Sequence, residues 1–148
     1  MTPDGISDDD WDVTLDLAAR IVNATSGDSD HGLYNRLNRQ MSKHLDTLEE
    51  KYGPLPSILA MKADYAEDTI ERIRLLEKAW EHAEGGAYRA NKTLIASSLA
   101  ETYIDELGNV DKGKDWLSRL EKALGDHWDD DEHKEFQRLV EAIKLLEQ

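Results

Sequence analysis

The 148-residue chain contains no cysteine, and this absence removes several classes of site. It excludes disulfides, thiol nucleophiles and zinc sites built on cysteine ligands. Proline is scarce, occurring only at Pro3, Pro54 and Pro56, and runs of β-branched residues are lacking. Glu, Leu, Ala, Lys and Arg are plentiful instead. This composition predicts an all-α protein that folds as one domain.

Long apolar runs are absent as well. No uninterrupted apolar stretch approaches the roughly 20 residues that cross a membrane as a helix. The first residues, MTPDGISDDDWD, have neither the basic start nor the apolar run of a secretion signal. We therefore expect a soluble cytoplasmic protein with no membrane partner, in which residues 1–6 form a disordered lead.

Basic residues are few compared with acidic ones: 18 Lys and Arg face 32 Asp and Glu, for a net charge of −14. The net charge is −7 over residues 1–50, −2 over residues 51–124 and −5 over residues 125–148. Such a field repels nucleic acid and accelerates association with a basic protein. The alternative is that the acidity only keeps the protein soluble.

Apolar periodicity and breaker residues predict seven helices. We expect them at about 8–24, 30–52, 56–66, 69–84, 88–107, 111–125 and 130–147. In the first helix, the expected apolar stripe is Trp11, Leu15, Ala18 and Val22, with Leu17 and Ile21 beside it. Asp28 or Ser29 is the expected N-cap of the second helix. Loops of two to six residues between the helices predict antiparallel neighbours throughout.

A short repeat decides how we expect the helices to assemble. Leu-Glu-Lys-Ala-Trp at 76–80 is matched by Leu-Glu-Lys-Ala-Leu at 120–124, displaced by 44 residues. Each copy ends the second helix of a predicted hairpin, and such self-similarity is typical of helical solenoids. We therefore predict an α-solenoid of about seven antiparallel helices, with a closed helical bundle as the alternative.

The second of these hairpins resembles the tetratricopeptide-repeat family. The resemblance rests on the turn Leu107-Gly108-Asn109 and on the spacing of Trp116, Leu120 and Ala123 in the following helix. In the preceding hairpin, Leu76 and Ala79 occupy the positions that correspond to Leu120 and Ala123. Arg72 departs from the pattern at the position that corresponds to Trp116, and the period is 44 rather than the family's 34. The resemblance covers about residues 55–125. It implies a right-handed superhelix whose concave surface binds a peptide or protein, with helix 130–147 as its cap.

The segment before the last helix holds the candidate partner-binding residues. An aromatic side chain beside a run of carboxylates is a plausible anchor for a basic partner. These residues are Trp128, Asp129, Asp130, Asp131 and Glu132. The alternative is that Trp128 packs as a staple at the helix start and that the acids favour the helix dipole.

Histidines and carboxylates also raise the question of a metal site. His127 and His133 flank Asp129, Asp130 and Asp131, and a weaker version of this arrangement is Asp28, Asp30 and His31. Their spacing matches neither a helical histidine pair nor a calcium loop. His44 lies beside the apolar stripe of the second helix, and we expect it to be neutral, hydrogen-bonded and half-buried.

Motifs for phosphate binding, serine nucleophiles and zinc peptidases are missing. We therefore expect a non-enzymatic interaction module without cofactors, an adaptor whose acidic surface engages a basic protein. One alternative is an immunity or antitoxin protein that neutralises a basic toxin such as a nuclease. Another is a metal-binding protein or enzyme that uses the acidic C-terminal segment.

Overall fold

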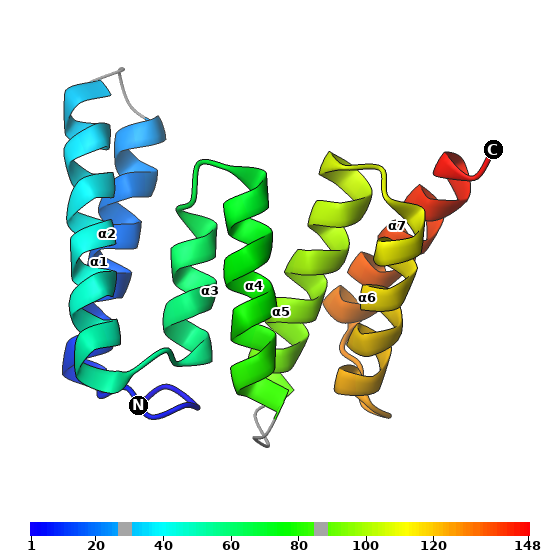
Figure 1. Ribbon diagram of the computed structural model, residues 1–148, viewed down its shortest axis with the longest axis horizontal. Helices are drawn as coiled ribbons and strands as arrows, with labels where there is room; N and C mark the ends of the chain where they lie inside the picture. The colour runs from blue at the N-terminus through cyan, green and yellow to red at the C-terminus, as the bar shows by residue number, and fades with distance from the viewer. Residues whose placement is uncertain (27–30, 85–88) are drawn as a thin grey trace.

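The computed structural model describes residues 1–26, 31–84 and 89–148. Over these residues it contains helices and no strands, as the composition predicts (Figure 1). None of the described helices is long and apolar enough to cross a membrane. The helices are α1 (Asp8–Ser26), α2 (His31–Tyr52), α3 (Pro56–Asp64), α4 (Thr69–Glu84), α5 (Arg89–Glu101), the π-helix η1 (Thr102–Glu106), α6 (Val110–Leu124) and α7 (Asp130–Leu146).

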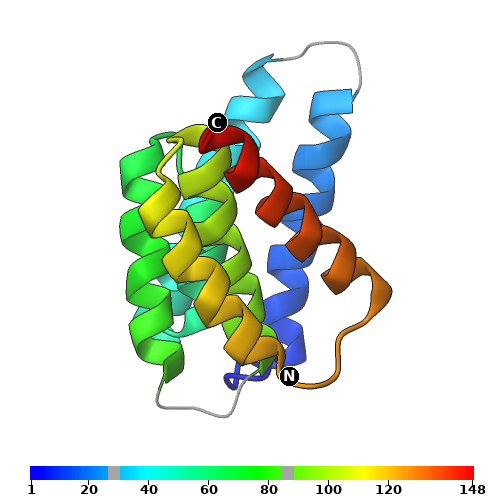
Figure 2. The same ribbon diagram turned by 90° about the vertical axis from the view of Figure 1, so that its right-hand side faces the viewer.

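Helices pack mainly against their neighbours in the sequence. The pairs α1–α2, α3–α4 and α5–α6 form hairpins, and α4 and α5 join the last two hairpins. α7 packs against α6 and η1. The helices stand in a row in chain order, with α1 and α2 at one end and α7 at the other (Figures 1 and 2). Hairpin packing between consecutive helices is therefore confirmed.

Two apolar cores meet at α3, because this helix contributes adjacent residues to each. Ile58 is fully buried against α1 and α2, whereas Leu59 is buried in the larger core made by α3 to α7. The smaller core is built around Leu17, Ile21, Leu37, Met41, Leu45 and Leu48. α3 thus connects the N-terminal hairpin to the remainder of the chain.

The buried face of α1 differs from the expected stripe. Leu15 and Val22 are 51% and 61% exposed, whereas Thr14, Leu17 and Ile21 are buried. α1 carries two apolar rows separated by roughly a quarter turn, because successive residues advance by about 100°. Both rows have helical spacing, so periodicity alone did not identify the one that contacts α2. The predicted stripe of α1 was wrong for Leu15 and Val22, whereas Trp11 and Ala18 pack against the smaller core.

Residues 1–6, expected to be a disordered lead, instead form a turn that packs on the molecule. Ile6 is fully buried in the smaller core. The Asp4 carboxylate accepts hydrogen bonds from the backbone N–H and the hydroxyl of Ser57, at 2.7 and 2.8 Å. Leu55, the N-cap residue of α3, supplies no side-chain cap. Asp4 therefore satisfies an N–H group at the start of α3, which no local residue does.

The single helix predicted over 88–107 changes its winding after Glu101. Residues Thr102–Glu106 form a π-helix, and the Leu107 N–H donates to the Thr102 carbonyl at 3.2 Å. The wider turn leaves Ile104 buried against Gly113 of α6, while Leu107 is 48% exposed. Leu107 therefore does not continue the buried row that Ile95 and Leu99 form in α5. The proposed caps Asp28 and Ser29 lie outside the described residues.

His44 is half-buried and hydrogen-bonded, as predicted. Its Nε2 lies 2.9 Å from the Thr14 hydroxyl, which is fully buried between α1 and α2. Burial lowers the pKa of His44 below its ordinary value of 6.5, and the nearby Asp10 carboxylate partly opposes this. Asp10 is held ionised by Lys51 and Tyr52, whose hydrogen bonds lower its pKa to about 2. His44 is therefore a neutral member of the interface between α1 and α2.

The lowered pKa of His44 predicts a loss of stability in mild acid. The unfolded chain binds a proton at His44 near pH 6.5, and the folded chain does so only at lower pH. The free energy of unfolding should therefore fall as the pH drops below about 6.5. Urea denaturation from pH 7.5 to 5 should show a shallower decline for His44→Gln than for the natural chain. Equal slopes in the two chains would contradict this assignment.

Candidate functional site

The start of α7 is organised by a reciprocal pair of hydrogen bonds. The Asp129 carboxylate accepts from the backbone N–H of Glu132 at 2.7 Å, and the Glu132 carboxylate accepts from the N–H of Asp129 at 2.9 Å. Asp129 is the N-cap, and this capping box satisfies two backbone donors. Two of the predicted partner-binding residues therefore also define where α7 begins.

Trp128 lies immediately before this cap and packs onto α7. Its ring centroid is 4.9 Å from that of His133 and 5.0 Å from that of Phe136. The indole N–H donates to the Gly125 carbonyl at 2.6 Å. Contact between the residue before the N-cap and the fourth helical residue is the geometry of a hydrophobic staple. Of the two interpretations of Trp128, these contacts favour the staple.

Arg89, the first residue of α5, ties this corner to the adjacent hairpin. Its guanidinium donates to the Leu124 and His127 carbonyls, at 3.3 and 2.9 Å. It also pairs with the Glu132 carboxylate at 3.3 Å. The segment between α6 and α7 is therefore held against the start of α5, and the acidic side chains that follow it are presented from a supported position.

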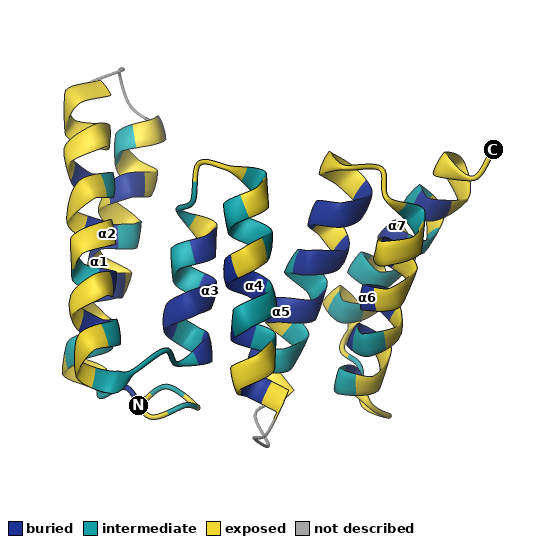
Figure 3. Ribbon diagram, in the orientation of Figure 1, coloured by how far each residue is buried: buried dark blue, intermediate teal, exposed yellow. Residues whose placement is uncertain are grey.

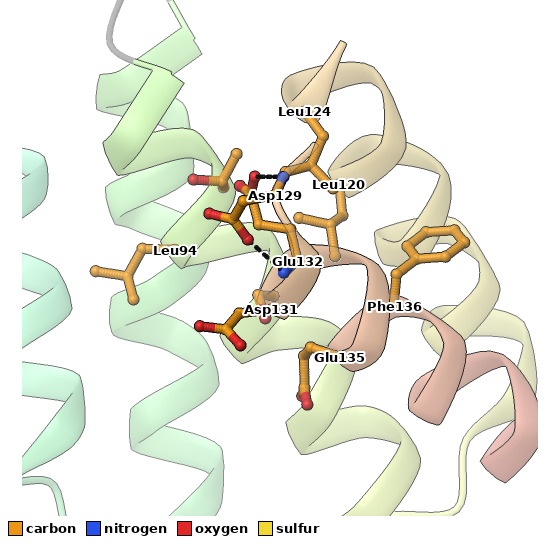
Figure 4. Close-up of a pocket in the computed structure, with 10 residues that line it drawn as sticks. Leu94, Leu120, Leu124, Asp129, Asp131, Glu132, Glu135 and Phe136 are labelled. Carbon is orange, nitrogen blue, oxygen red and sulfur yellow. Dashed lines mark hydrogen bonds between the residues drawn. The ribbon is translucent and has the colours of Figure 1, made fainter. Parts of the chain in front are cut away.

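A pocket of about 320 Å³ lies between α5, α6 and the first turns of α7 (Figure 4). Its apolar wall comes from three helices and consists of Leu94, Leu120, Leu124 and Phe136. Leu94 is 55% exposed, so this side chain is open to solvent in the isolated chain. Phe136 contacts Trp128, which makes the staple a support for the pocket wall.

Four carboxylates surround this apolar wall: Asp129, Asp131, Glu132 and Glu135. These four carboxylates differ in whether they already have a partner within the chain. Asp129 and Glu132 are engaged in the capping box, and Glu135 pairs with Arg138 at 3.0 Å. Asp131 makes no ion pair within the part of the chain that the structure describes. Among the described residues that line the pocket, none is basic, so its rim is acidic.

The structure brings together some of the predicted site residues and separates others. Asp129, Asp131 and Glu132 line the pocket, whereas Trp128 and Asp130 do not. The prediction missed Leu94, which lies outside the buried row of α5, and Glu135, which follows Asp131 by four residues. That i, i+4 spacing places both carboxylates on one face of α7 and was available in the sequence. Leu94 had no such signal, because its role depends on α7 lying beside α5.

The histidines of the metal hypothesis do not converge with the acids. Over residues 1–26, 31–84 and 89–148, no group of three or more His, Asp or Glu side chains is placed to hold a metal ion. His133 instead stacks beside Trp128. Asp28 and Asp30, from the weaker version of this hypothesis, lie outside the described residues.

Comparisons with known proteins assign no family to this chain. A scan against protein-family models, a search of curated proteins and a search of solved structures each returned no match.

Proposed function

We propose that this chain is a cytoplasmic, non-enzymatic protein-interaction module whose partner is a basic protein. The observation that carries the proposal is the pocket between α5, α6 and α7, with its apolar wall and its rim of four carboxylates. Lysine and arginine combine an aliphatic stem with a cationic head, so one side chain satisfies both features. The pocket volume is at the lower end of the range typical of ligand sites, which suits one such residue and its neighbours.

The scaffold in this proposal is an α-solenoid that resembles tetratricopeptide repeats. Its support is that the repeated letters lie on the second helix of two successive hairpins: Leu76, at the middle of α4, and Leu120, near the end of α6, are both buried. The row of hairpins also favours an open stack over a closed bundle (Figure 1). In a stack, α7 covers the last hairpin as a capping helix. An adaptor on such a scaffold presents its binding residues from rigid helices.

An immunity or antitoxin protein is a specific version of the same function. The net charge of −14 supports it, because charge complementarity speeds association with a basic toxin. The two versions differ in the partner alone: one dominant basic protein for an inhibitor, or several clients for an adaptor.

A capture experiment with matched variants tests the proposal. The tagged chain is incubated with lysate of the organism that produces it and washed at low and high salt. We expect a basic protein to be retained at low salt and lost at high salt, because exposed charges are screened. The double substitution Leu94→Asn and Asp131→Asn should reduce its recovery about tenfold, since it removes the open part of the wall and the unpaired carboxylate.

Asp130→Asn is the matched control. It makes the same charge change at the next residue, which does not line the pocket. Recovery with Asp130→Asn should stay within about twofold of the natural chain. Equal recovery with the double variant and the control would contradict the proposed site, and retention of only acidic proteins would contradict the proposed partner class.

A further inference from the structure

The second apolar row of α1 has the spacing of a helix-pairing seam: Leu15 and Val22 are exposed, and Trp11 and Ala18 are only partly buried against the smaller core. Trp11, Leu15, Ala18 and Val22 follow one another at intervals of four, three and four residues. This is the alternation of a and d positions in a coiled coil. From Trp11 to Val22 the row runs for about 16 Å along the helix, at the usual rise per residue. We call these four residues the outer seam of α1.

The outer seam is accessible in the folded chain. Leu15 and Val22 are 51% and 61% exposed, and Trp11 and Ala18 are partly exposed. α1 packs against α2 through its other row, and the pair forms one end of the molecule (Figures 1 and 3). Ala18 and the exposed Ala19 beside it are small, which allows a second helix to approach closely. The α1 end of the molecule therefore presents the outer seam as an apolar strip that is partly open to solvent.

Carboxylates border one side of this strip. α1 contains five aspartates and one arginine, and the helical positions of Asp8, Asp12 and Asp16 place them along the same edge of the outer seam. Asp8 pairs with the N-terminal ammonium group and Asp16 pairs with Arg20 at 3.1 Å. Asp12 makes no ion pair among the residues that the structure describes. This edge of the outer seam is therefore acidic, and its negative charge is only partly neutralised by ion pairs.

We infer that the outer seam of α1 docks an amphipathic helix of a basic partner. Apolar residues of the incoming helix would cover Leu15 and Val22, and lysines or arginines at its flank would face Asp12. A second copy of this chain fits this surface less well. It would bring another net charge of −14 to the interface, and like charges across a helix pair disfavour association.

This surface is separate from the pocket at α7. The outer seam lies at the α1 end of the row and the pocket lies near the α7 end (Figure 1). A partner with two basic segments could occupy both, and each linked contact would strengthen the other. Substitutions on α1 and on α7 therefore test the two sites separately, and either site can fail without the other.

The test uses a defined probe, a 21-residue peptide of three heptads with leucine at a and d and lysine at e and g. We expect it to bind the full chain in fluorescence anisotropy and to shift the Trp11 indole resonance in ¹H–¹⁵N spectra. The double variant Leu15→Asn and Val22→Asn should weaken binding at least tenfold. Both positions are exposed, so the variant should fold normally, which circular dichroism and thermal melting check.

Val13→Asn is the matched control, because Val13 is 47% exposed on the same helix but lies outside the outer seam. Its affinity should stay within about twofold of the natural chain. Equal weakening by Val13→Asn, absence of binding at millimolar peptide, or loss of binding only with Leu94→Asn and Asp131→Asn would each overturn the inference. A dimer in sedimentation that dissociates on Leu15→Asn and Val22→Asn would also overturn it, by assigning the seam to a second copy.

Discussion

Leu99→Ala should lower the free energy of unfolding by about 3 kcal/mol. Leu99 is fully buried in the last turn of α5, within the core shared by α3 to α7. Removing its side chain loses the transfer free energy of the deleted atoms and leaves a cavity that rigid neighbours fill incompletely. Urea denaturation followed by circular dichroism measures the change, with the natural chain and the variant compared at the same pH.

Leu94→Ala provides the control on the same helix. Leu94 is 55% exposed, so the same deletion should change the unfolding free energy by less than about 0.5 kcal/mol. It should nevertheless weaken binding of the basic partner, because Leu94 forms part of the pocket wall. The two leucines therefore separate stability from binding. A loss of stability at Leu94 comparable to that at Leu99 would show that Leu94 belongs to the core.

Gly113→Leu should destabilise the chain by about 3 kcal/mol, through overpacking between α6 and η1. A Cβ atom at Gly113 would lie 2.5 Å from Cγ1 and 3.1 Å from Cδ1 of Ile104. It would also lie 3.8 Å from Cδ1 of Ile143 on α7. Replacing a glycine inside a helix with leucine gains at most about 1 kcal/mol from the higher helix propensity, which is less than the expected steric cost. Thermal and urea denaturation report the net effect.

A second substitution identifies the steric cause of that effect. Ile104→Ala removes the atoms that the new side chain would strike, although it is destabilising alone because Ile104 is buried. The double variant should therefore be more stable than the sum of the two single changes predicts. Lys112→Leu, at the exposed neighbouring position, should be nearly neutral. Additive effects at residues 104 and 113 would mean that the close approach of α6 to η1 is not the cause.

The sequence predicted the helices well because their signals are local. Gly53 directly follows α2 and has a φ of +84°, which a residue without Cβ adopts easily. Pro56 starts α3, and the acids at 129–132 start α7, in agreement with ordinary capping preferences. The change to π-helix after Glu101 had no local signal. It arises where Ile104 must fit against Gly113, which is 9 residues away and on another helix.

The candidate site was predictable only in part, for the same reason. The carboxylates after Trp128 were visible as a run of letters, and three of the five predicted residues line the pocket. The apolar wall was not visible, because Leu94 and Phe136 are 42 residues apart and line the same pocket only in the packed chain. The Asp4 cap of α3 shows the same limit, since its partner Ser57 is 53 residues away.

Composition, apolar periodicity and breaker residues by themselves determined that this chain is helical, approximately where most of its described helices begin and end, and that its charge is strongly acidic. Only the tertiary structure decided which faces are buried. α1 makes this clear, because its two apolar rows have equally good helical spacing, and contact with α2 buries the row of Leu17 and Ile21. Periodicity records that a face is apolar, but burial depends on which other helix covers it, and that is a property of the packed chain.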